Sequence, residues 1–231
     1  MPEAQDKGAA GSKTKNASPG KNKSRHDFVE GDRYAPAPEN SEHVVLKESY
    51  DLYIGGEWLR APKRTETRNP ATGEVLAEVG EAGPGMVKKA VAAARTAYEQ
   101  TWSTMPGRER GKYLFRLARL IQERSREFAV VETMDGGKPI RESRDIDLPL
   151  VAAHFFYYAG WADKIHHVLG TVNPVAGPYF NFTMPEPTGV VALVAPEEPA
   201  LLGLASRLAP VIVSGNTAVA VVDAEAGLAA V

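Results

Sequence analysis

The sequence of 231 residues contains no cysteine. This absence excludes disulfide bonds, thiolate metal sites and a cysteine nucleophile in this chain. It fits a reducing compartment, and we expect a cytoplasmic protein. Long apolar runs are also lacking, because the longest, residues 201–213, is interrupted by Arg207 and is too short to span a bilayer. We therefore expect no membrane span, and the polar N-terminus predicts no secretory signal.

A strong excess of charge of either sign is lacking as well, since the formal net charge is −2. The hydrophobic content of 43% predicts a globular core. Residues 1–33 are the exception: they are poor in large apolar side chains, and we predict a disordered basic tail. Its cations are Lys13, Lys15, Lys21, Lys23 and Arg25. No aromatic residues lie between them, so a solvated tail is favoured and nucleic-acid binding is not expected.

Residues 34–50 are expected to form a Pro-containing adaptor, and a small antiparallel β-element follows it. Residues 52–59 predict two short strands around the turn at Gly55-Gly56, and residues 75–79 alternate like another strand. Helical spacing then predicts three helices, over residues 84–98, from about 106 to Gly136, and 148–167. The apolar face predicted for the second helix comprises Tyr113, Leu114, Leu117, Leu120, Ile121 and Phe128.

The last third of the chain predicts a β-α-β unit. Residues 189–194 and 217–222 are apolar runs typical of parallel strands buried on both faces. An apolar helix over residues 200–213 connects them and is capped by Ser214-Gly215-Asn216. The unit is the start of a doubly wound dinucleotide-binding sheet. Asp223 is expected to begin a further helix.

Three motifs have a structural and a functional interpretation. Gly136-Gly137-Lys138-Pro139 lacks the upstream glycine and following hydroxyl of a phosphate loop, so a helix C-cap is favoured. The pair His166-His167 has no partner at metal-ligand spacing, and we predict no metal site. The aromatic cluster in residues 155–161 favours core packing, with a cofactor-facing ring as the alternative.

The loop after the first buried strand carries the observation that bears most on function. It reads Ala195-Pro196-Glu197-Glu198-Pro199-Ala200, without the glycine fingerprint of dinucleotide-binding proteins. Acidic side chains are stabilised beside the positive end of a helix dipole. A dinucleotide pyrophosphate at the same place would meet two negative charges.

Several motifs, taken in order, resemble the N-terminal half of aldehyde dehydrogenases. They are Tyr53-Ile54-Gly55-Gly56-Glu57-Trp58, Asn69-Pro70-Ala71-Thr72-Gly73-Glu74, Glu132-Thr133-Met134-Asp135-Gly136-Gly137-Lys138-Pro139, Glu186-Pro187-Thr188-Gly189-Val190 and Gly215-Asn216-Thr217. The resemblance implies an α/β fold. Residues 34–231 would form the N-terminal part of an incomplete Rossmann-type NAD(P)-binding domain with a β-element and helices, and the catalytic domain would be absent.

The same resemblance implies the chemistry of the family. There a cysteine attacks an aldehyde, hydride passes to the nicotinamide, and a glutamate-activated water hydrolyses the thioester. The implied cofactor is NAD or NADP, and family position assigns cofactor binding to Ala195 and Pro196. Residues 172–187 would supply part of an oligomerisation hairpin, so we expect homo-oligomers or hetero-oligomers with aldehyde dehydrogenase subunits.

This sequence departs from the family pattern at three places. Glu197 and Glu198 stand where the family usually has Trp and Asn, and an ionised Glu198 would repel the oxyanion that the Asn amide helps to hold. Val221 stands at the position of the cofactor-ribose lysine. The family's cysteine, general-base glutamate and glycine-containing phosphate turn would all follow residue 231.

These departures lead to three hypotheses. The first is a family member that is inactive alone, has no catalytic residue of its own, and binds NAD or NADP weakly or not at all. The second is a non-enzymatic partner that docks on an active aldehyde dehydrogenase through residues 172–187. The third is a truncated gene product, in which two sheet strands leave an open hydrophobic edge.

Overall fold

The computed structural model describes residues 40–42, 44–225 and 227–231. The predicted tail, residues 1–33, lies outside these residues, as do residues 34–39 of the predicted cofactor-binding domain. Five strands open the described part: β1 (Ser49–Tyr50), β2 (Leu52–Ile54), β3 (Glu57–Leu59), β4 (Lys63–Arg68) and β5 (Val75–Glu81).

The five strands form two small sheets. The β2–β3 hairpin is antiparallel and turns at Gly55 and Gly56, whose φ angles of 65° and 92° suit a two-residue hairpin turn. The other sheet has the order β1-β5-β4. Strand β1, which runs parallel to β5, and strand β4 were not predicted. Only polar side chains make up β4, so it carries no apolar alternation, although its Thr67 is buried.

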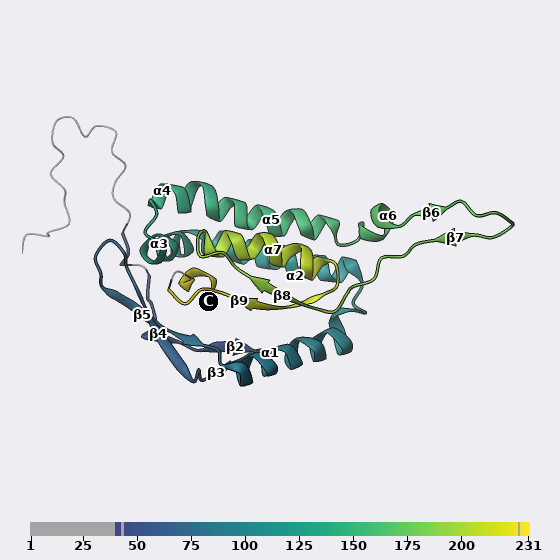
Figure 1. The fold of residues 1–231 in the computed structure, drawn as a ribbon. Coiled ribbons are helices and arrows are strands. Elements are labelled where there is room, and N and C mark those ends of the chain that lie inside the picture. Colours follow the sequence, from purple (N-terminus) through teal and green to yellow (C-terminus); the bar gives the residue numbers. More distant parts are fainter. Residues whose placement is uncertain (1–39, 43, 226) are drawn as a thin grey trace, which may run out of the picture. The chain divides into compact units, whose positions relative to one another are not determined.

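Figure 1 shows the helices in layers above and below the parallel strands of residues 190–194 and 217–221. The helices are α1 (Pro84–Ala97), α2 (Gly107–Glu123), α3 (Ser125–Gly136), α4 (Ile140–Glu142), α5 (Leu148–Trp161), α6 (Ile165–Leu169) and α7 (Ala200–Val213). In the part of the chain that the structure describes, no helix is both long and apolar enough to cross a membrane.

The predicted second and third helices are each broken. The second divides into α2 and α3 at Arg124, whose φ and ψ of −106° and 15° are not helical. The third ends at Trp161, and α6 follows it as a separate short helix. The predicted end at Gly136 is confirmed, because Gly137 has a left-handed φ of 74° and caps α3.

Helices α2 and α5 pack closely along a stripe of small residues. A Cβ on Gly107 would lie 2.1 Å from the carbonyl oxygen of Ala162, so only glycine fits there. Below it Leu114, Ala118 and Ile121 are buried. The predicted apolar face was therefore wrong in part. Three residues predicted on that face are exposed: Tyr113, Leu117 and Leu120.

The end of α7 is held by side chains from the segment around the start of α2. Trp102 donates its indole N–H to the carbonyl of Ile212 (3.0 Å), and Arg110 donates Nε to the carbonyl of Val213 (3.1 Å). These carbonyls belong to the last turn of a helix, where hydrogen-bond donors are needed. Burial lowers the pKa of Arg110. A cation at this end also suits the helix dipole.

The predicted β-α-β unit is confirmed. Strands β8 (Val190–Val194) and β9 (Thr217–Val221) are parallel, and α7 connects them. Burial on both faces was wrong, since Val194 is 69% exposed and Val221 54% exposed. The helix predicted from Asp223 is also wrong, because only a 3₁₀-helical turn, Leu228–Ala230, forms there.

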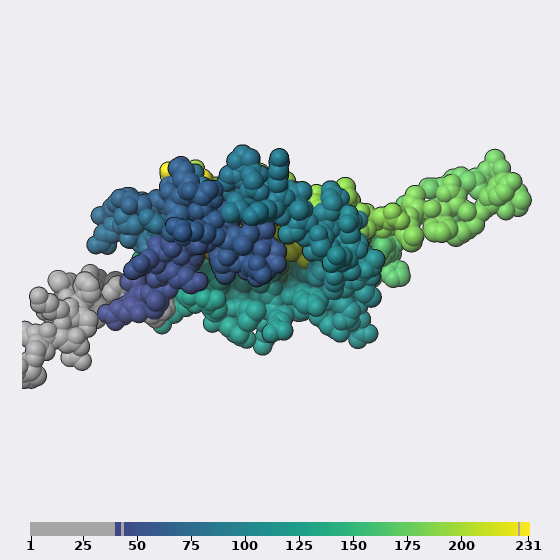
Figure 2. Space-filling view, turned by 90° about the horizontal axis from the view of Figure 1, so that it is seen from below, coloured from purple at the N-terminus to yellow at the C-terminus, as the bar shows by residue number. Residues whose placement is uncertain are grey.

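A hairpin arm made of β6 (Val172–Asn173) and β7 (Asn181–Phe182) projects away from the helices (Figures 1 and 2). Only two residues on each side of the hairpin pair with each other. Its aromatic side chains are exposed: Tyr179 at 77%, Phe180 at 75% and Phe182 at 58%.

Candidate functional site

The predicted cofactor-binding residues lie between β8 and α7. The N–H of buried Ala195 donates to the carbonyl of Val221 (2.9 Å), so it extends the β8–β9 ladder and is not free for a phosphate. Pro196 has no N–H, and its ring lies against Gly203, where a Cβ would come within 2.2 Å of Pro196 Cγ. The two predicted residues therefore offer no main-chain donor to an anion.

Glu197 and Glu198 follow at the start of α7, and both are exposed. The N-cap residue of α7 is Pro199, which has no side-chain oxygen to accept a hydrogen bond from the first helical turn. The helix dipole stabilises the two carboxylates next to it, so the acids occupy the electrostatic position that a phosphate would take. Val221, at the position of the family's lysine, is the last residue of β9 and presents an apolar, half-exposed side chain.

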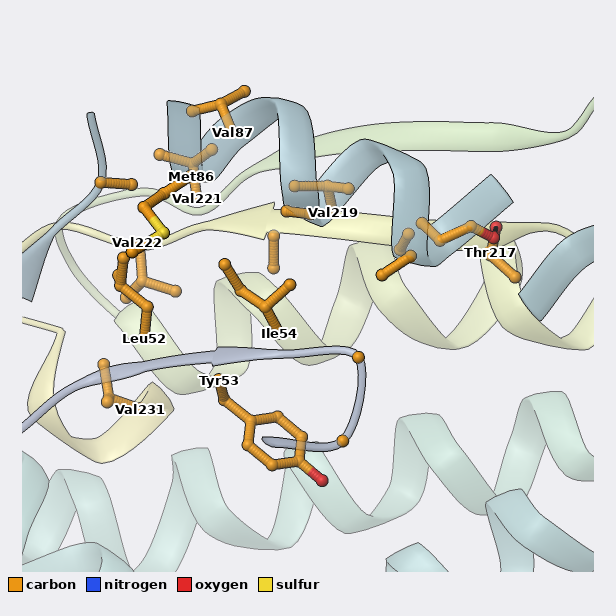
Figure 3. A pocket seen from close by; sticks show the side chains of 18 of the residues that line it. Leu52, Tyr53, Ile54, Met86, Val87, Thr217, Val219, Val221, Val222 and Val231 are labelled. Atoms are coloured by element: carbon orange, nitrogen blue, oxygen red, sulfur yellow. Dashed lines mark hydrogen bonds between the residues drawn. The ribbon is translucent and has the colours of Figure 1, made fainter. Parts of the chain in front are cut away.

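A cavity of about 1210 Å³ lies beside β9, between the β2–β3 hairpin and α1. Figure 3 shows Ile54 pointing toward β9 while Tyr53, the next residue along β2, points away. The labelled side chains that line it are Leu52, Tyr53, Ile54, Met86, Val87, Thr217, Val219, Val221, Val222 and Val231. The cavity is larger than the usual range of about 300–1,000 Å³ for small-molecule sites. The sequence predicted the two short strands within residues 52–59, but not the cavity beside them.

Three polar side chains around this cavity are hydrogen-bonded within the chain. Thr217 donates to the carbonyl of Ala94 (2.9 Å), and Asp51 accepts from Arg64 (2.7 Å). Glu81 accepts from Lys63 (2.8 Å). The cavity is lined mainly by apolar side chains, and these three polar side chains already have partners within the chain.

A cluster of buried charges lies behind the start of α7. Lys138 pairs with Asp147 (Nζ–Oδ2 2.5 Å) and with Glu132 (Nζ–Oε1 3.2 Å), and all three side chains are buried. Burial raises the pKa of Glu132, while the charge of Lys138 lowers it. Neither oxygen of Glu132 accepts a well-formed hydrogen bond. Lys138 is therefore bound within the protein, as the helix-cap interpretation of its motif requires.

His166 and His167 lie exposed in the last turn of α6. Among the residues that the structure describes, no three His, Asp or Glu side chains are arranged to hold a metal ion. Of the aromatic cluster in residues 155–161, Phe155 is buried, whereas Tyr157 is 59% exposed. Core packing is therefore confirmed for Phe155, and Phe156 and Tyr158 pack partly buried against the same core.

The sequence model described as "Aldehyde dehydrogenase family" matches residues 58–231. The chain belongs to the aldehyde dehydrogenase family. It is similar to retinal dehydrogenase 2 of Homo sapiens, with 41% identity over 172 residues that cover 73% of this chain and 33% of that protein. The mitochondrial aldehyde dehydrogenase of Rattus norvegicus is 39% identical over 188 residues, which cover 80% of this chain and 35% of that protein.

Solved aldehyde dehydrogenases match the described fold. A structure of the NAD+ complex of aldehyde dehydrogenase from Bacillus cereus matches with a TM-score of 0.70 and 36% identity, covering 75% of this chain and 35% of that one. The chain thus has the α/β, NAD-binding type of fold found in this family. It spans about a third of the length of the curated relatives that it matches.

Proposed function

We propose that this chain is an aldehyde dehydrogenase-family polypeptide that does not oxidise aldehydes by itself. The observation that carries the proposal is the absence of cysteine, because the family resemblance assigns the attack on the aldehyde to a thiolate. Serine and threonine are present, but their unactivated hydroxyls are much weaker nucleophiles at neutral pH.

The α7 start supports the same proposal from the cofactor side. Ala195 and Pro196 offer no free N–H, and Glu197 and Glu198 place carboxylates where a pyrophosphate would lie. The residues present do not fit the phosphates of NAD or NADP, so we infer weak or absent cofactor binding. We propose no catalytic role for any residue of this chain.

Purified chain is expected to form no NADH or NADPH when incubated with short aliphatic and aromatic aldehydes and either cofactor. The reason is chemical, since neither a thiolate nor an accommodating phosphate site is available. Absorbance of the reduced nicotinamide is the readout, and an active aldehyde dehydrogenase under identical conditions is the control. Reduced cofactor formed at a rate proportional to the concentration of the chain would overturn the proposal.

A second candidate function is that of a non-enzymatic subunit partner. The β6–β7 arm supports it, because Tyr179, Phe180 and Phe182 expose their rings away from the core. Phe180 and Phe182 also contact each other, with ring centroids 5.6 Å apart. Exposed clusters of apolar side chains of this kind commonly mark protein–protein contacts.

The double variant Phe180→Ser/Phe182→Ser is expected to lower the sedimentation coefficient of the chain by abolishing self-association, or association with an added active aldehyde dehydrogenase. Loss of the two rings removes the apolar area that the contact would bury. Tyr157→Ser is the matched control, since Tyr157 is 59% exposed on α5 but lies outside the arm. A wild-type chain that sediments as a monomer alone and in the mixture would refute the candidate.

A further inference from the structure

Asp135, on α3, is a buried carboxyl group that joins three segments far apart in the sequence. Its Oδ1 lies 2.5 Å from Oγ1 of Thr67 on β4. Its Oδ2 accepts the N–H of Leu228 (2.7 Å), in the 3₁₀-helical turn after β9. Oγ1 of Thr67 lies, in addition, 2.9 Å from the carbonyl oxygen of Glu225. Asp135 and Thr67 are both almost fully buried, at 3% and 1% exposure.

Counting hydrogens decides the protonation state that this arrangement requires. A threonine hydroxyl carries a single hydrogen, but Thr67 has two oxygen neighbours at hydrogen-bond distance. If Asp135 is ionised, both neighbours are acceptors, and one of them faces the lone pairs of the hydroxyl. If Oδ1 of Asp135 carries a proton, it donates to Thr67, and Thr67 donates to the carbonyl of Glu225. Every polar atom of the group then has a partner.

The charges around Asp135 favour the protonated form. Burial raises the pKa of this carboxyl, the hydrogen bonds from Thr67 and Leu228 lower it, and the negative charge of Asp223 raises it again. On β4 the neighbours of Thr67 are Glu66 and Arg68, which pair with each other on the exposed face of the strand.

Among the residues that the structure describes, no cation acts on the carboxyl group of Asp135. On α3 itself Glu132 pairs with Lys138, whose other partner is Asp147. The turn after β9 contributes Asp223, whose Oδ1 accepts the N–H of Glu225 (2.7 Å), and the exposed side chain of Glu225. The 3₁₀-helical turn that follows contains only leucine and alanine.

We propose that Asp135 is a proton-binding site that fastens residues 223–225 and 227–231 to α3 and β4 more firmly while its carboxyl group is protonated, because only then are both contacts of Thr67 satisfied. When Asp135 is ionised, the single hydroxyl hydrogen of Thr67 can serve only one of its two oxygen neighbours, so one of these two contacts is lost. Ala224, Ala230 and Val231 line the cavity beside β9, so the proton on Asp135 also holds one wall of that cavity in place.

The direction of the pH effect follows from the raised pKa. The arrangement with both Thr67 contacts satisfied is complete at pH values below the ordinary aspartate pKa of about 3.9, and one of these two contacts is lost as pH rises through the higher pKa that Asp135 has in the folded chain. An Asn at this position carries a permanent N–H donor and a carbonyl acceptor, so it imitates the protonated acid at every pH.

The test is hydrogen exchange of the full chain, with the exchange rate of the Leu228 amide divided by its intrinsic rate at each pH. We expect protection in the wild type to be higher at about pH 4 than at about pH 8, because the raised pKa of Asp135 favours the protonated carboxyl at the lower pH. In Asp135→Asn the protection is expected to stay high across this range. Glu132 still titrates in that variant, so the difference between the two profiles isolates Asp135.

Two further variants keep the result interpretable. Thr67→Ser retains the hydroxyl and is expected to keep the wild-type pH profile, even if its overall stability is lower. Asp163→Asn is the matched control, because Asp163 is exposed and pairs with Lys164. Identical pH profiles for wild type and Asp135→Asn, or a flat profile in the wild type, would overturn the proposal.

Discussion

Replacing Lys138 with methionine is expected to lower the free energy of unfolding by about 3–5 kcal/mol, the cost of removing one partner of a buried ion pair. Lys138 is the cation between Asp147 and Glu132. Burial alone lowers the pKa of Lys138, but the hydrogen bond and charge of Asp147 and those of Glu132 outweigh it and raise the pKa. The ammonium is therefore charged in the folded chain, and its loss leaves two carboxylates without a counter-ion.

Urea unfolding at neutral pH measures the effect. Lys63→Met is the matched control, since Lys63 pairs with Glu81 on the surface with 71% of its side chain exposed. Its expected effect is below about 1 kcal/mol, as for other exposed pairs. Adding Glu132→Gln to Lys138→Met is expected to recover part of the loss, because it neutralises one of the stranded acids. A Lys138→Met chain as stable as the Lys63→Met control would show that the buried cluster does not stabilise the fold.

Local patterns in the sequence predicted the elements that depend on local physics. The β2–β3 hairpin follows from Gly55-Gly56, and α7 and its two flanking strands follow from apolar runs separated by a glycine-containing cap. The end of α3 follows from Gly137, because glycine adopts the left-handed conformation without strain.

The elements that failed depend on contacts between distant parts of the chain. The helix breaks at Arg124 although the helical pattern of the sequence is continuous there, and no glycine or proline in the sequence marks the break. Strand β4 is polar, so only its pairing with β5 reveals it. The exposure of β8 and β9 depends on what covers the sheet, which periodicity within a strand does not contain.

The sequence predicted the candidate site in part, as it did the fold. Family position identified Ala195 and Pro196, but the use of the Ala195 N–H by Val221 and the contact of Pro196 with Gly203 are tertiary features. Lys138 was recognised as unsuited to a phosphate loop, yet its buried partners lie 6 and 9 residues away on different turns. The sequence did not predict the cavity beside β9. It predicted only that the two-stranded sheet would leave an open apolar edge.

The second large effect concerns the cofactor. A pyrophosphate at the start of α7 would need main-chain donors, and it would approach the carboxylates of Glu197 and Glu198. Like charges at such short range repel, and the apolar Val221 provides no cation to offset them. We therefore expect this chain to bind NAD and NADP weakly or not at all, although it belongs to the aldehyde dehydrogenase family.

Titration calorimetry of the purified, cooperatively folded chain with NAD and with NADP tests this central claim most directly. The expected result is no saturable heat with either nucleotide up to about 1 mM, a Kd limit that corresponds to about −4.1 kcal/mol. An active aldehyde dehydrogenase titrated in the same buffer confirms that binding is detectable. A saturable complex with a Kd of about 1 μM, about −8.2 kcal/mol, would contradict the account.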